Sequence, residues 1–380
     1  MVQMVNSTDR KRILFALPGL HHVTRGAEVA FESVAQEIAK LPGYEVTLIG
    51  SGYERSSQLY KFKHAGCINR NFFQKWPSIP LLRDYYMYEE LSFVPNLLKA
   101  YSPSDYDLTV TCSYPYTNWV LRYWKEKGYR PAQVFVTQNG DWPAQAKNSE
   151  YKFFACDGLI CTNPEYYERN HQNWLSKLIP NGVDPSLFHP GEPDRAIFKI
   201  PGNLPVVLMV SALVPDKRVL EGIKCVAKIK DIYLIVAGDG PLRQQVNELG
   251  KEMMEGRFQH LVVPRQMMPN LYRSADVFLH MSQDEPSANV YIEALATGLP
   301  IVTQDRFVTR WTLENEALFV DTSSESEVMQ GIQQALNMKK ADDISSRRNL
   351  VERRFSWSAI AQDYCEFFNQ VLLRKIKLLK

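Results

Sequence analysis

The sequence predicts an α/β protein with two doubly wound parallel sheets, each in a domain of its own. Short apolar runs alternate with helical patterns along most of the 380 residues, and such alternation is typical of parallel strands joined by helical crossovers. The whole pattern occurs twice. A stretch containing prolines and glycines, residues 180–203, separates the two occurrences and indicates a linker between domains.

The first set of apolar runs predicts a sheet in the N-terminal half. Between the first two runs, residues 28–41 carry apolar side chains at helical spacing, with Val29, Phe31, Val34 and Ile38 on one face. This pattern predicts an amphipathic helix that covers the sheet. The expected strands of this half are residues 12–17, 45–49, 107–111, 133–137 and 158–161.

The second set of apolar runs predicts another sheet of the same kind after the linker. Ligands of such sheets bind outside the carboxyl ends of the strands, so the loops that follow the strands are the candidate functional segments. The expected strands of this half are residues 205–210, 233–237, 260–263, 277–281, 301–303 and 318–320.

Composition excludes several classes of protein. A hydrophobic content of 45% and a charged content of 23% are those of a globular protein, and a net charge of +2 argues against nucleic acid as a partner. The six cysteines are scattered and form no Cys-x-x-Cys pair, so we expect buried free thiols rather than disulfides or zinc ligands. The polar first residues and the lack of a long apolar run predict a cytoplasmic protein with neither a signal peptide nor a membrane span.

Two glutamates carry the strongest functional signal. Glu285 follows the apolar run 277–281, and Glu293 lies two turns further on, inside a helical pattern that ends at Gly298. A helix that begins just after Glu285 exposes unpaired backbone N–H groups, which hold a phosphate well. Carboxylates beside that phosphate accept hydrogen bonds from sugar hydroxyls, so the segment suits a sugar nucleotide better than a free phosphate or a metal ion.

This arrangement resembles the paired-glutamate motif of retaining family-four glycosyltransferases of the GT-B fold. Three further segments resemble that family in the same order: residues 179–184, followed by Phe188 and Pro190, residues 210–218, and residues 237–241. The resemblance implies two Rossmann-like domains that face each other across a cleft. It implies an acceptor-binding domain over residues 1–185, a nucleotide-sugar-binding domain over 186–360, and a C-terminal helix over 361–380 that crosses back to the first domain.

The resemblance also assigns roles to residues. Lys217 matches the lysine that binds the donor phosphates, Glu285 the glutamate that binds the donor sugar, and Glu293 the one that binds the ribose. Because negative charge develops on the departing diphosphate, a positive group placed there is a large catalytic contribution. The implied donor-binding residues are Gly26, Ser211, Lys217, Arg218, Arg265, Glu285, Ser287, Ala288, Asn289, Val290 and Glu293.

Two departures from the family pattern bear on catalysis. Ser211-Ala212 stands where the family has Gly-Arg, and Arg25-Gly26 stands where it has Gly-Gly. We therefore expect Arg25 to supply part of the missing positive charge, as a third catalytic residue with Lys217 and Glu285. Gly26 keeps the backbone freedom that allows close approach to a ligand.

The loop after residues 133–137 is a further departure from the family pattern. The family often has a histidine there, whereas this chain has Gln138, Asn139, Gly140 and Asp141. Gln138 and Asn139 can hydrogen-bond a sugar or acceptor hydroxyl, and Asp141 could act as a base, although Asn-Gly-Asp is also ordinary turn chemistry. The resemblance implies retention by front-face displacement, in which the departing phosphate takes the acceptor's proton.

The predicted reaction needs no cofactor and no metal. Asp105-Tyr106-Asp107 has the spelling of a metal-binding Asp-x-Asp, but it directly precedes a strand of the first half. We predict transfer of a hexose from a nucleoside-diphosphate sugar, with UDP favoured, to a saccharide or lipid-linked acceptor in polysaccharide or envelope glycan synthesis. The alternatives are a GT-B epimerase and a non-catalytic nucleotide-sugar-binding partner of another transferase.

Two segments remain open to more than one interpretation. Residues 71–94 are rich in aromatic side chains, which either pack in the core or form a surface for an acceptor sugar or lipid headgroup. Residues 372–380 mix leucines with Arg374, Lys375, Lys377 and Lys380. They either contact the inner face of a membrane as a peripheral segment or end the final helix.

Overall fold

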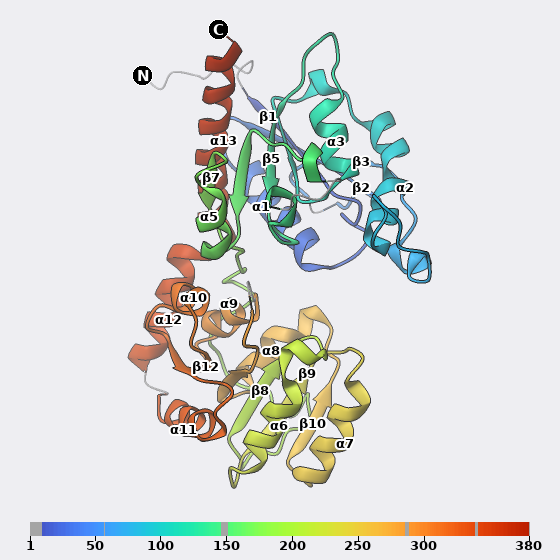
Figure 1. Cartoon of the computed structure of the whole chain (residues 1–380). Coiled ribbons are helices and arrows are strands. Elements are labelled where there is room, and N and C mark those ends of the chain that lie inside the picture. Colours follow the sequence, from blue (N-terminus) through green and yellow to red (C-terminus); the bar gives the residue numbers. More distant parts are fainter. Residues whose placement is uncertain (1–9, 57, 146–150, 286–288, 339–340, 380) are drawn as a thin grey trace, which may run out of the picture. The chain divides into compact units, whose positions relative to one another are not determined.

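The structure is a computed structural model that describes residues 10–56, 58–145, 151–285, 289–338 and 341–379. It divides into two compact units (Figure 1). Unit 1 combines Met1–Asn181 with Trp357–Lys380, and unit 2 is Gly182–Ser356. Each unit contains one parallel sheet, so the predicted fold class of two doubly wound parallel sheets is confirmed.

Unit 1 has a seven-stranded sheet in the order β3-β2-β1-β4-β5-β6-β7. The order reverses between β1 and β4, and the carboxyl ends of such a strand pair frame the usual ligand crevice of this architecture. Sequence analysis missed β3 and β7 because both are short and neither is a buried apolar run. The strands are β1 Lys11–Ala16, β2 Tyr44–Gly50, β3 Lys61–His64, β4 Leu108–Thr111, β5 Ala132–Val136, β6 Gly158–Cys161 and β7 Ser176–Leu178.

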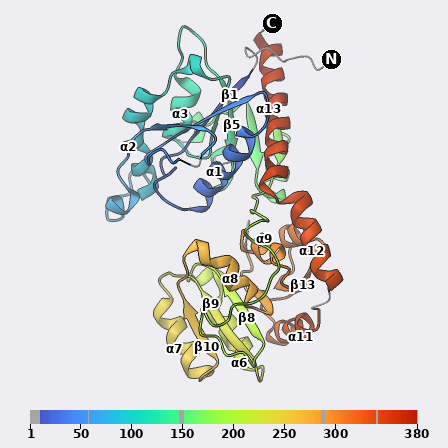
Figure 2. The same ribbon diagram turned by 180° about the vertical axis from the view of Figure 1, so that it is seen from behind.

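Helices cover the sheet of unit 1, and the last helix of the chain is one of them (Figure 2). This helix, α13, begins at Trp357 and packs on α1 and β5. Its Phe367 and Phe368 are fully buried beside Phe15 and Phe31, and each such side chain contributes about 2 kcal/mol through burial. The helices of unit 1 are α1 Gly26–Ala39, α2 Tyr85–Ala100, α3 Tyr116–Tyr123, α4 Trp142–Gln145, α5 Pro164–Asn170 and α13 Trp357–Leu379.

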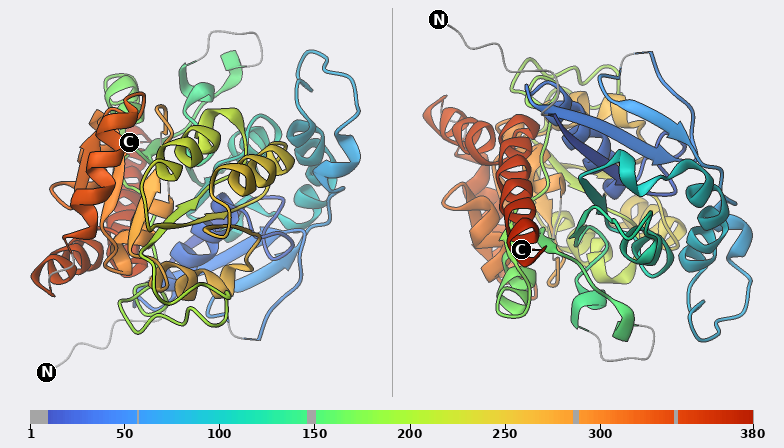
Figure 3. Two further views of the ribbon diagram at one scale, coloured as in Figure 1. Left: turned by 90° about the horizontal axis from the view of Figure 1, so that it is seen from below. Right: turned by 90° about the horizontal axis from the view of Figure 1, so that it is seen from above.

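Unit 2 has a six-stranded sheet in the order β10-β9-β8-β11-β12-β13, with helices on both sides (Figure 3). Two clusters of buried apolar side chains pack against it. The strands are β8 Val206–Val210, β9 Tyr233–Ala237, β10 Phe258–Leu261, β11 Val277–His280, β12 Ile301–Gln304 and β13 Ala317–Val320. The helices are α6 Val219–Ala227, α7 Arg243–Met253, α8 Met268–Arg273, α9 Asn289–Ala296, α10 Phe307–Leu313, α11 Glu325–Leu336 and α12 Ala341–Arg354.

The sequence also predicted the state of the cysteines. All six cysteines are free, and five of them are buried, as expected. Within the described ranges, no helix combines the length and apolar character that crossing a bilayer requires. The same ranges contain no cluster of three His, Cys, Asp or Glu side chains of the kind that holds a metal ion.

Candidate functional site

The strand order of unit 2 reverses between β8 and β11, and the loops after these strands carry most of the candidate residues. After β8, the Ser211 amide donates to the Ala237 carbonyl over 3.1 Å. Gly238, with φ 147°, is packed so closely that a Cβ there would lie 1.9 Å from the Ser211 carbonyl oxygen. The loops after β8 and β9 are therefore fixed against each other, which sets the path of the chain toward Lys217.

Lys217 and Arg218 lie where this loop turns into α6. A short 3-10 helix, Pro215–Lys217, ends at Arg218, whose φ of 52° and ψ of 37° are left-handed. A non-glycine residue in this conformation costs about 1–3 kcal/mol, and such strain clusters at functional sites. The Arg218 Nη2 donates to the Thr322 carbonyl over 3.4 Å, so its side chain is directed along the carboxyl ends of the strands.

The structure brings Lys217 and Glu285 together. The Lys217 ammonium donates a hydrogen bond to Oε2 of Glu285, which lies in the loop after β11. The Glu285 side chain is 9% exposed and that of Lys217 is 24% exposed. Two opposite charges thus neutralise each other at the point where the strand order reverses.

His280, the last residue of β11, also faces Glu285. Its Nε2 lies 3.6 Å from Oε2 of Glu285, and its Nδ1 lies 3.0 Å from the Tyr291 hydroxyl. Burial, reinforced by Lys217, lowers the pKa of His280 to about 3, so the ring is neutral near pH 7. If Tyr291 donates to Nδ1, the Nε2–H is directed at Glu285. Sequence analysis treated His280 only as part of a strand, although its place at the carboxyl end of that strand was a usable signal.

Glu293 lies inside α9 and is almost fully buried. The Tyr272 hydroxyl donates to its Oε2 over 2.9 Å, and Nη1 of Arg265 lies 3.8 Å from its Oε1. Burial raises the pKa of Glu293, and Arg265 and Tyr272 oppose that rise. A second polar group of unit 2 consists of Glu293, Tyr272 and Arg265. The contacts that join these three side chains do not involve Lys217 or Glu285.

The start of α9 is only partly described. Asn289 and Val290 are the first two described residues of this helix. Ser287 and Ala288, which were also expected to bind the donor, lie outside the described residues, as does Pro286.

Arg25 and Gly26 belong to unit 1. The Arg25 guanidinium contacts Glu89 over 3.2 and 3.4 Å and Glu28 over 3.5 Å, while Gly26 begins α1. Arg70 also binds Glu89, over 2.7 Å. Arg25 therefore already has carboxylate partners within its own unit.

The loop after β5 is held by hydrogen bonds within unit 1. The Gln138 amide donates to Asn181 over 2.6 Å, and the Asn139 carbonyl accepts from the Trp142 indole. Both oxygens of Asp141 are engaged, with Arg169 over 3.0 Å on each and with Asn170 over 2.9 Å. This geometry is that of a structural carboxylate. The Gln138 side-chain amide is already engaged with Asn181, so a bound hydroxyl would have to replace that contact.

The Asp105-Tyr106-Asp107 segment forms structural ion pairs. Asp107 binds Arg12 over 2.8 Å and Asp105 binds Lys63 over 3.3 Å. These contacts tie the start of β4 to β1 and β3.

The aromatic segment 71–94 and the end of α13 each contain both buried and exposed apolar side chains. In residues 71–94, Phe73, Tyr88 and Phe93 are buried, whereas Phe72 is 65% and Trp76 49% exposed. At the end of α13, Val371 is buried but Leu373 is 61% exposed. The end of α13 therefore leaves Leu373 outside the core of unit 1.

Part of unit 2 is similar to a known protein family. Residues 191–355 match the family model described as glycosyl transferases group 1. The matched segment lies within unit 2 and is less than half of the chain, so this part of the chain is similar to group 1 glycosyl transferases. It includes Lys217, Glu285 and Glu293, so the candidate site lies within the matched residues.

The similarity to curated relatives extends over more residues than the family match. The chain is 26% identical over 242 residues to the lipopolysaccharide core biosynthesis glycosyltransferase LpsE of Rhizobium meliloti (strain 1021), covering 61% of this chain and 68% of that protein. It is 28% identical over 211 residues to the phosphatidylinositol N-acetylglucosaminyltransferase GPI3 subunit of Saccharomyces cerevisiae (strain YJM789), covering 52% of this chain and 46% of the subunit. The chain thus spans about half the length of the yeast subunit.

Solved structures share the fold of the whole chain. Sucrose-phosphate synthase from Thermosynechococcus elongatus has a TM-score of 0.74 at 19% identity, covering 96% of this chain and all of that one. Anabaena Alr3699/HepE, solved with UDP-glucose, has a TM-score of 0.67 at 18% identity, covering 94% and 99%. These likenesses show that the chain has the GT-B fold.

Proposed function

We propose that this protein is a retaining glycosyltransferase that moves a hexose from a nucleoside-diphosphate sugar to a saccharide or lipid-linked acceptor in envelope glycan synthesis. The observation that carries the proposal is the Lys217–Glu285 ion pair, placed where the strand order reverses within the residues that match the group 1 family. An ammonium and a carboxylate at this position match the two ends of a sugar diphosphate.

Binding of the donor exchanges partners at this pair. The diphosphate oxygens take the Lys217 ammonium, which leaves the Glu285 carboxylate free to accept hydrogen bonds from sugar hydroxyls. His280 stays neutral, and with Tyr291 donating to its Nδ1 it directs the Nε2–H at Glu285, so the carboxylate retains one oriented neighbour when Lys217 turns away. After the exchange Lys217 faces the diphosphate, and hydrogen bonds from the sugar hydroxyls take the place of the ion pair at Glu285.

The reaction then breaks the bond between the anomeric carbon and the phosphate oxygen. The acceptor oxygen forms its bond on the same face, and the departing phosphate oxygen receives the acceptor's proton. Lys217 stabilises the negative charge that develops on the diphosphate. This course needs no protein base, which agrees with Asp141 having both oxygens engaged.

The nucleotide end of the donor is assigned to the second polar group of unit 2. Glu293 accepts from the ribose hydroxyls, Arg265 lies beside the base and ribose, and the amides of Asn289 and Val290 face the phosphates. Arg218 and Ser211 complete the phosphate side. HepE, which shares the fold, was solved with UDP-glucose, and UDP-glucose is therefore the first donor to test.

The acceptor assignment is supported by the names of the relatives. LpsE is named for the lipopolysaccharide core and the yeast subunit for phosphatidylinositol, and both names describe saccharide transfer to lipid-anchored molecules. We extend this acceptor class to the present chain.

A donor-hydrolysis experiment tests the proposal. The protein is incubated with UDP-, GDP- and ADP-glucose without acceptor, and release of the nucleoside diphosphate is measured for the native chain, Glu285→Gln and the control Glu248→Gln. Glu248 is an exposed helix residue whose carboxylate contacts only Gln244 among the described side chains. We expect slow release by the native chain and the control, and loss in Glu285→Gln.

Two other results would contradict the transferase assignment. Tight donor binding without turnover of any donor would favour the non-catalytic partner. Conversion of the donor sugar into an epimer without release of the diphosphate would favour the epimerase.

A further inference from the structure

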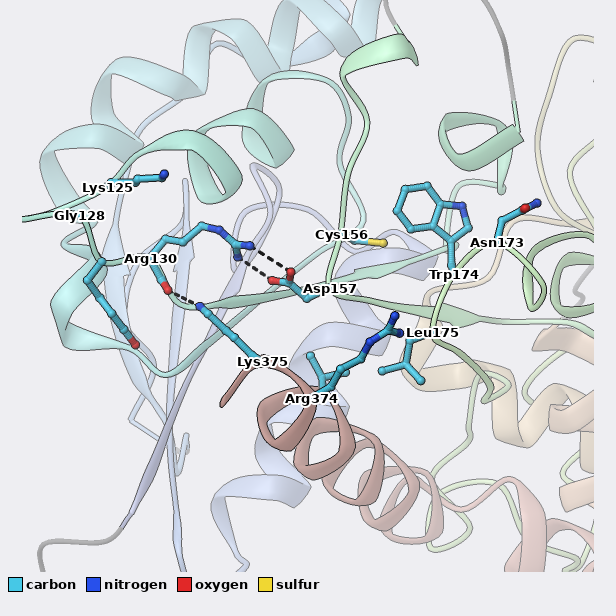
Figure 4. Close-up of a pocket in the computed structure, with 12 residues that line it drawn as sticks. Lys125, Gly128, Arg130, Cys156, Asp157, Asn173, Trp174, Leu175, Arg374 and Lys375 are labelled. Atoms are coloured by element: carbon cyan, nitrogen blue, oxygen red, sulfur yellow. Dashed lines mark hydrogen bonds and ion pairs between the residues drawn. The ribbon is translucent and has the colours of Figure 1, made fainter. Parts of the chain in front are cut away.

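Unit 1 contains a cavity of about 480 Å³ (Figure 4). It lies at the amino ends of β5, β6 and β7, whereas the candidate acceptor loop follows the carboxyl end of β5. Three lining residues, Arg130, Asp157 and Leu175, come just before β5, β6 and β7. Gln138 and Asn139 instead follow the far end of β5. The other wall is the end of α13, with Val371, Arg374 and Lys375. The cavity is therefore a separate site, of the size of ordinary small-molecule pockets.

The cavity is strongly positive. Four lining residues are cationic, Lys125, Arg130, Arg374 and Lys375, and Asp157 is the one lining carboxylate, so its formal charge is 4 − 1 = +3. Arg130 binds Asp157 over 2.6 and 3.0 Å, and Arg122 binds it over 2.6 Å. Although burial opposes ionisation, these arginines lower the pKa of Asp157 to about 2. The single carboxylate is thus already neutralised by its own arginines.

The other cations that line the cavity, Lys125, Arg374 and Lys375, have no carboxylate partner among the described residues. Across the described residues, Lys125 and Arg374 have neither a hydrogen bond nor an ion pair, and both are exposed at the cavity. Lys375 donates to the Arg130 carbonyl and lies 5.5 Å from the centre of the Tyr129 ring. Burial, with Arg130 nearby, lowers the pKa of Lys375 to about 8. A bound anion would relieve the repulsion among these cations.

Exposed apolar side chains adjoin the cationic ones in the sequence. Trp124, beside Lys125, is 50% exposed, while Leu373 and Ile376, beside Arg374 and Lys375, are 61% and 52% exposed. Tyr123 adds a second exposed ring. Amphipathic aromatic rings, aliphatic side chains and cations occurring together are typical of surfaces that lie at a lipid headgroup layer.

We propose that this cavity binds the phosphate headgroup of an anionic phospholipid and thereby holds unit 1 on a membrane surface. Lys125 and Arg374, which lie on opposite sides of the Arg130–Asp157 pair (Figure 4), both attract the phosphate. Trp174, Leu175 and Val371 contact the glycerol and first methylene groups, and Trp124, Leu373 and Ile376 enter the headgroup layer. The proposal concerns binding alone and is independent of the reaction proposed for unit 2.

Vesicle flotation with the full chain tests this site. Vesicles of phosphatidylcholine alone and of equal parts phosphatidylcholine and phosphatidylglycerol are compared for the native chain and for the double variant Lys125→Gln/Arg374→Gln. Because a cation near an anionic surface contributes about 1 kcal/mol, the double variant should bind the anionic vesicles about thirtyfold more weakly. Both side chains are exposed and lack described partners, so the variant should fold normally, which its thermal melting checks.

Controls separate the cavity from general electrostatics and from soluble phosphate. Lys377→Gln removes a cation of the same helix that does not line the cavity, and Lys217→Ala removes the phosphate-binding lysine proposed for unit 2; both should bind vesicles as the native chain does. The lipid proposal is overturned if Lys377→Gln is as weak as the double variant, or if the double variant binds normally. It is also overturned if inorganic phosphate binds in a manner that depends on Lys125 and Arg374 while the vesicles do not bind, since the site would then take a soluble phosphate.

Discussion

Lys217 and Glu285 are 68 residues apart in the sequence, and in the structure the lysine ammonium donates a hydrogen bond to the glutamate carboxylate. The contact forms because β8 and β11 are neighbours, with Val207 opposite Val277 and Leu208 opposite Phe278. Loops that leave the same edge of these two strands bring both side chains together. In the absence of donor, each of these two charges serves as the other's partner.

Lys217→Ala should lower turnover by about 10²–10³, because it removes the positive group that faces the departing diphosphate. Lys224→Ala, an exposed lysine on α6, is the matched control and should behave as the native chain. Release of nucleoside diphosphate is measured together with thermal melting. A small loss of stability is expected because Glu285 loses its partner, but turnover that stays within a few-fold of native would refute the role of Lys217.

Glu293→Gln should act mainly on donor binding. A hydrogen bond to a charged group contributes about 1.5–3 kcal/mol, so KM for the donor should rise about tenfold or more while kcat changes less. Tyr272→Phe removes the hydroxyl that orients Glu293 and should raise KM in the same direction by a smaller factor. A large fall in kcat with unchanged KM would place Glu293 at the reacting centre instead of the ribose.

Arg25→Ala should weaken donor binding and turnover together, by about tenfold, if Arg25 supplies positive charge to the diphosphate. Arg70→Ala is the informative control, since Arg70 binds the same Glu89 carboxylate. If both variants lose activity equally, Arg25 acts through Glu89 and not on the donor.

His280 should make the protein less stable in mild acid. Its pKa is about 3 in the folded chain and about 6.5 when unfolded, so between these values the unfolded state binds more protons. The free energy of unfolding therefore falls as pH drops from 6.5 toward 3, by about 5 kcal/mol in total. His280→Gln should lose this part of the pH dependence in urea unfolding, whereas the exposed His189→Gln should keep it.

Glu90 should have the opposite effect in unit 1. It is buried on α2 and accepts from the Thr117 amide over 2.8 Å, and burial raises its pKa to about 7. The folded state binds more protons between pH 4.5 and 7, so this group destabilises the protein as pH rises through that range, by about 3 kcal/mol. Glu90→Gln should be more stable than the native chain at pH 8 and similar to it at pH 5, while the surface variant Glu37→Gln should show no such difference. Equal pH profiles for Glu90→Gln and the native chain would show that Glu90 is ionised throughout.

The sequence by itself determined the fold class, and it singled out the candidate residues of the site. Buried strands such as β8 and β9 are continuous apolar runs, which is why their positions could be predicted to within a residue. The strands that were missed, β3 and β7, lie at the sheet edges and are only partly buried, so no apolar run marked them. Lys217, Glu285 and Glu293 could be singled out because each follows a recognisable strand or lies in the helix after one.

Only the tertiary structure decided which side chains meet. Several contacts join residues that are distant in the sequence or on different elements. His280 lies beside Glu285, two arginines bind Glu89, and both oxygens of Asp141 are engaged. The same holds for the cavity between the amino ends of β5 to β7 and α13. Local sequence fixes hydrophobic periodicity and turn chemistry, because these depend on neighbouring residues. Ion pairs and cavities depend on strand order and helix packing, which the distribution of buried apolar surface over the whole chain determines.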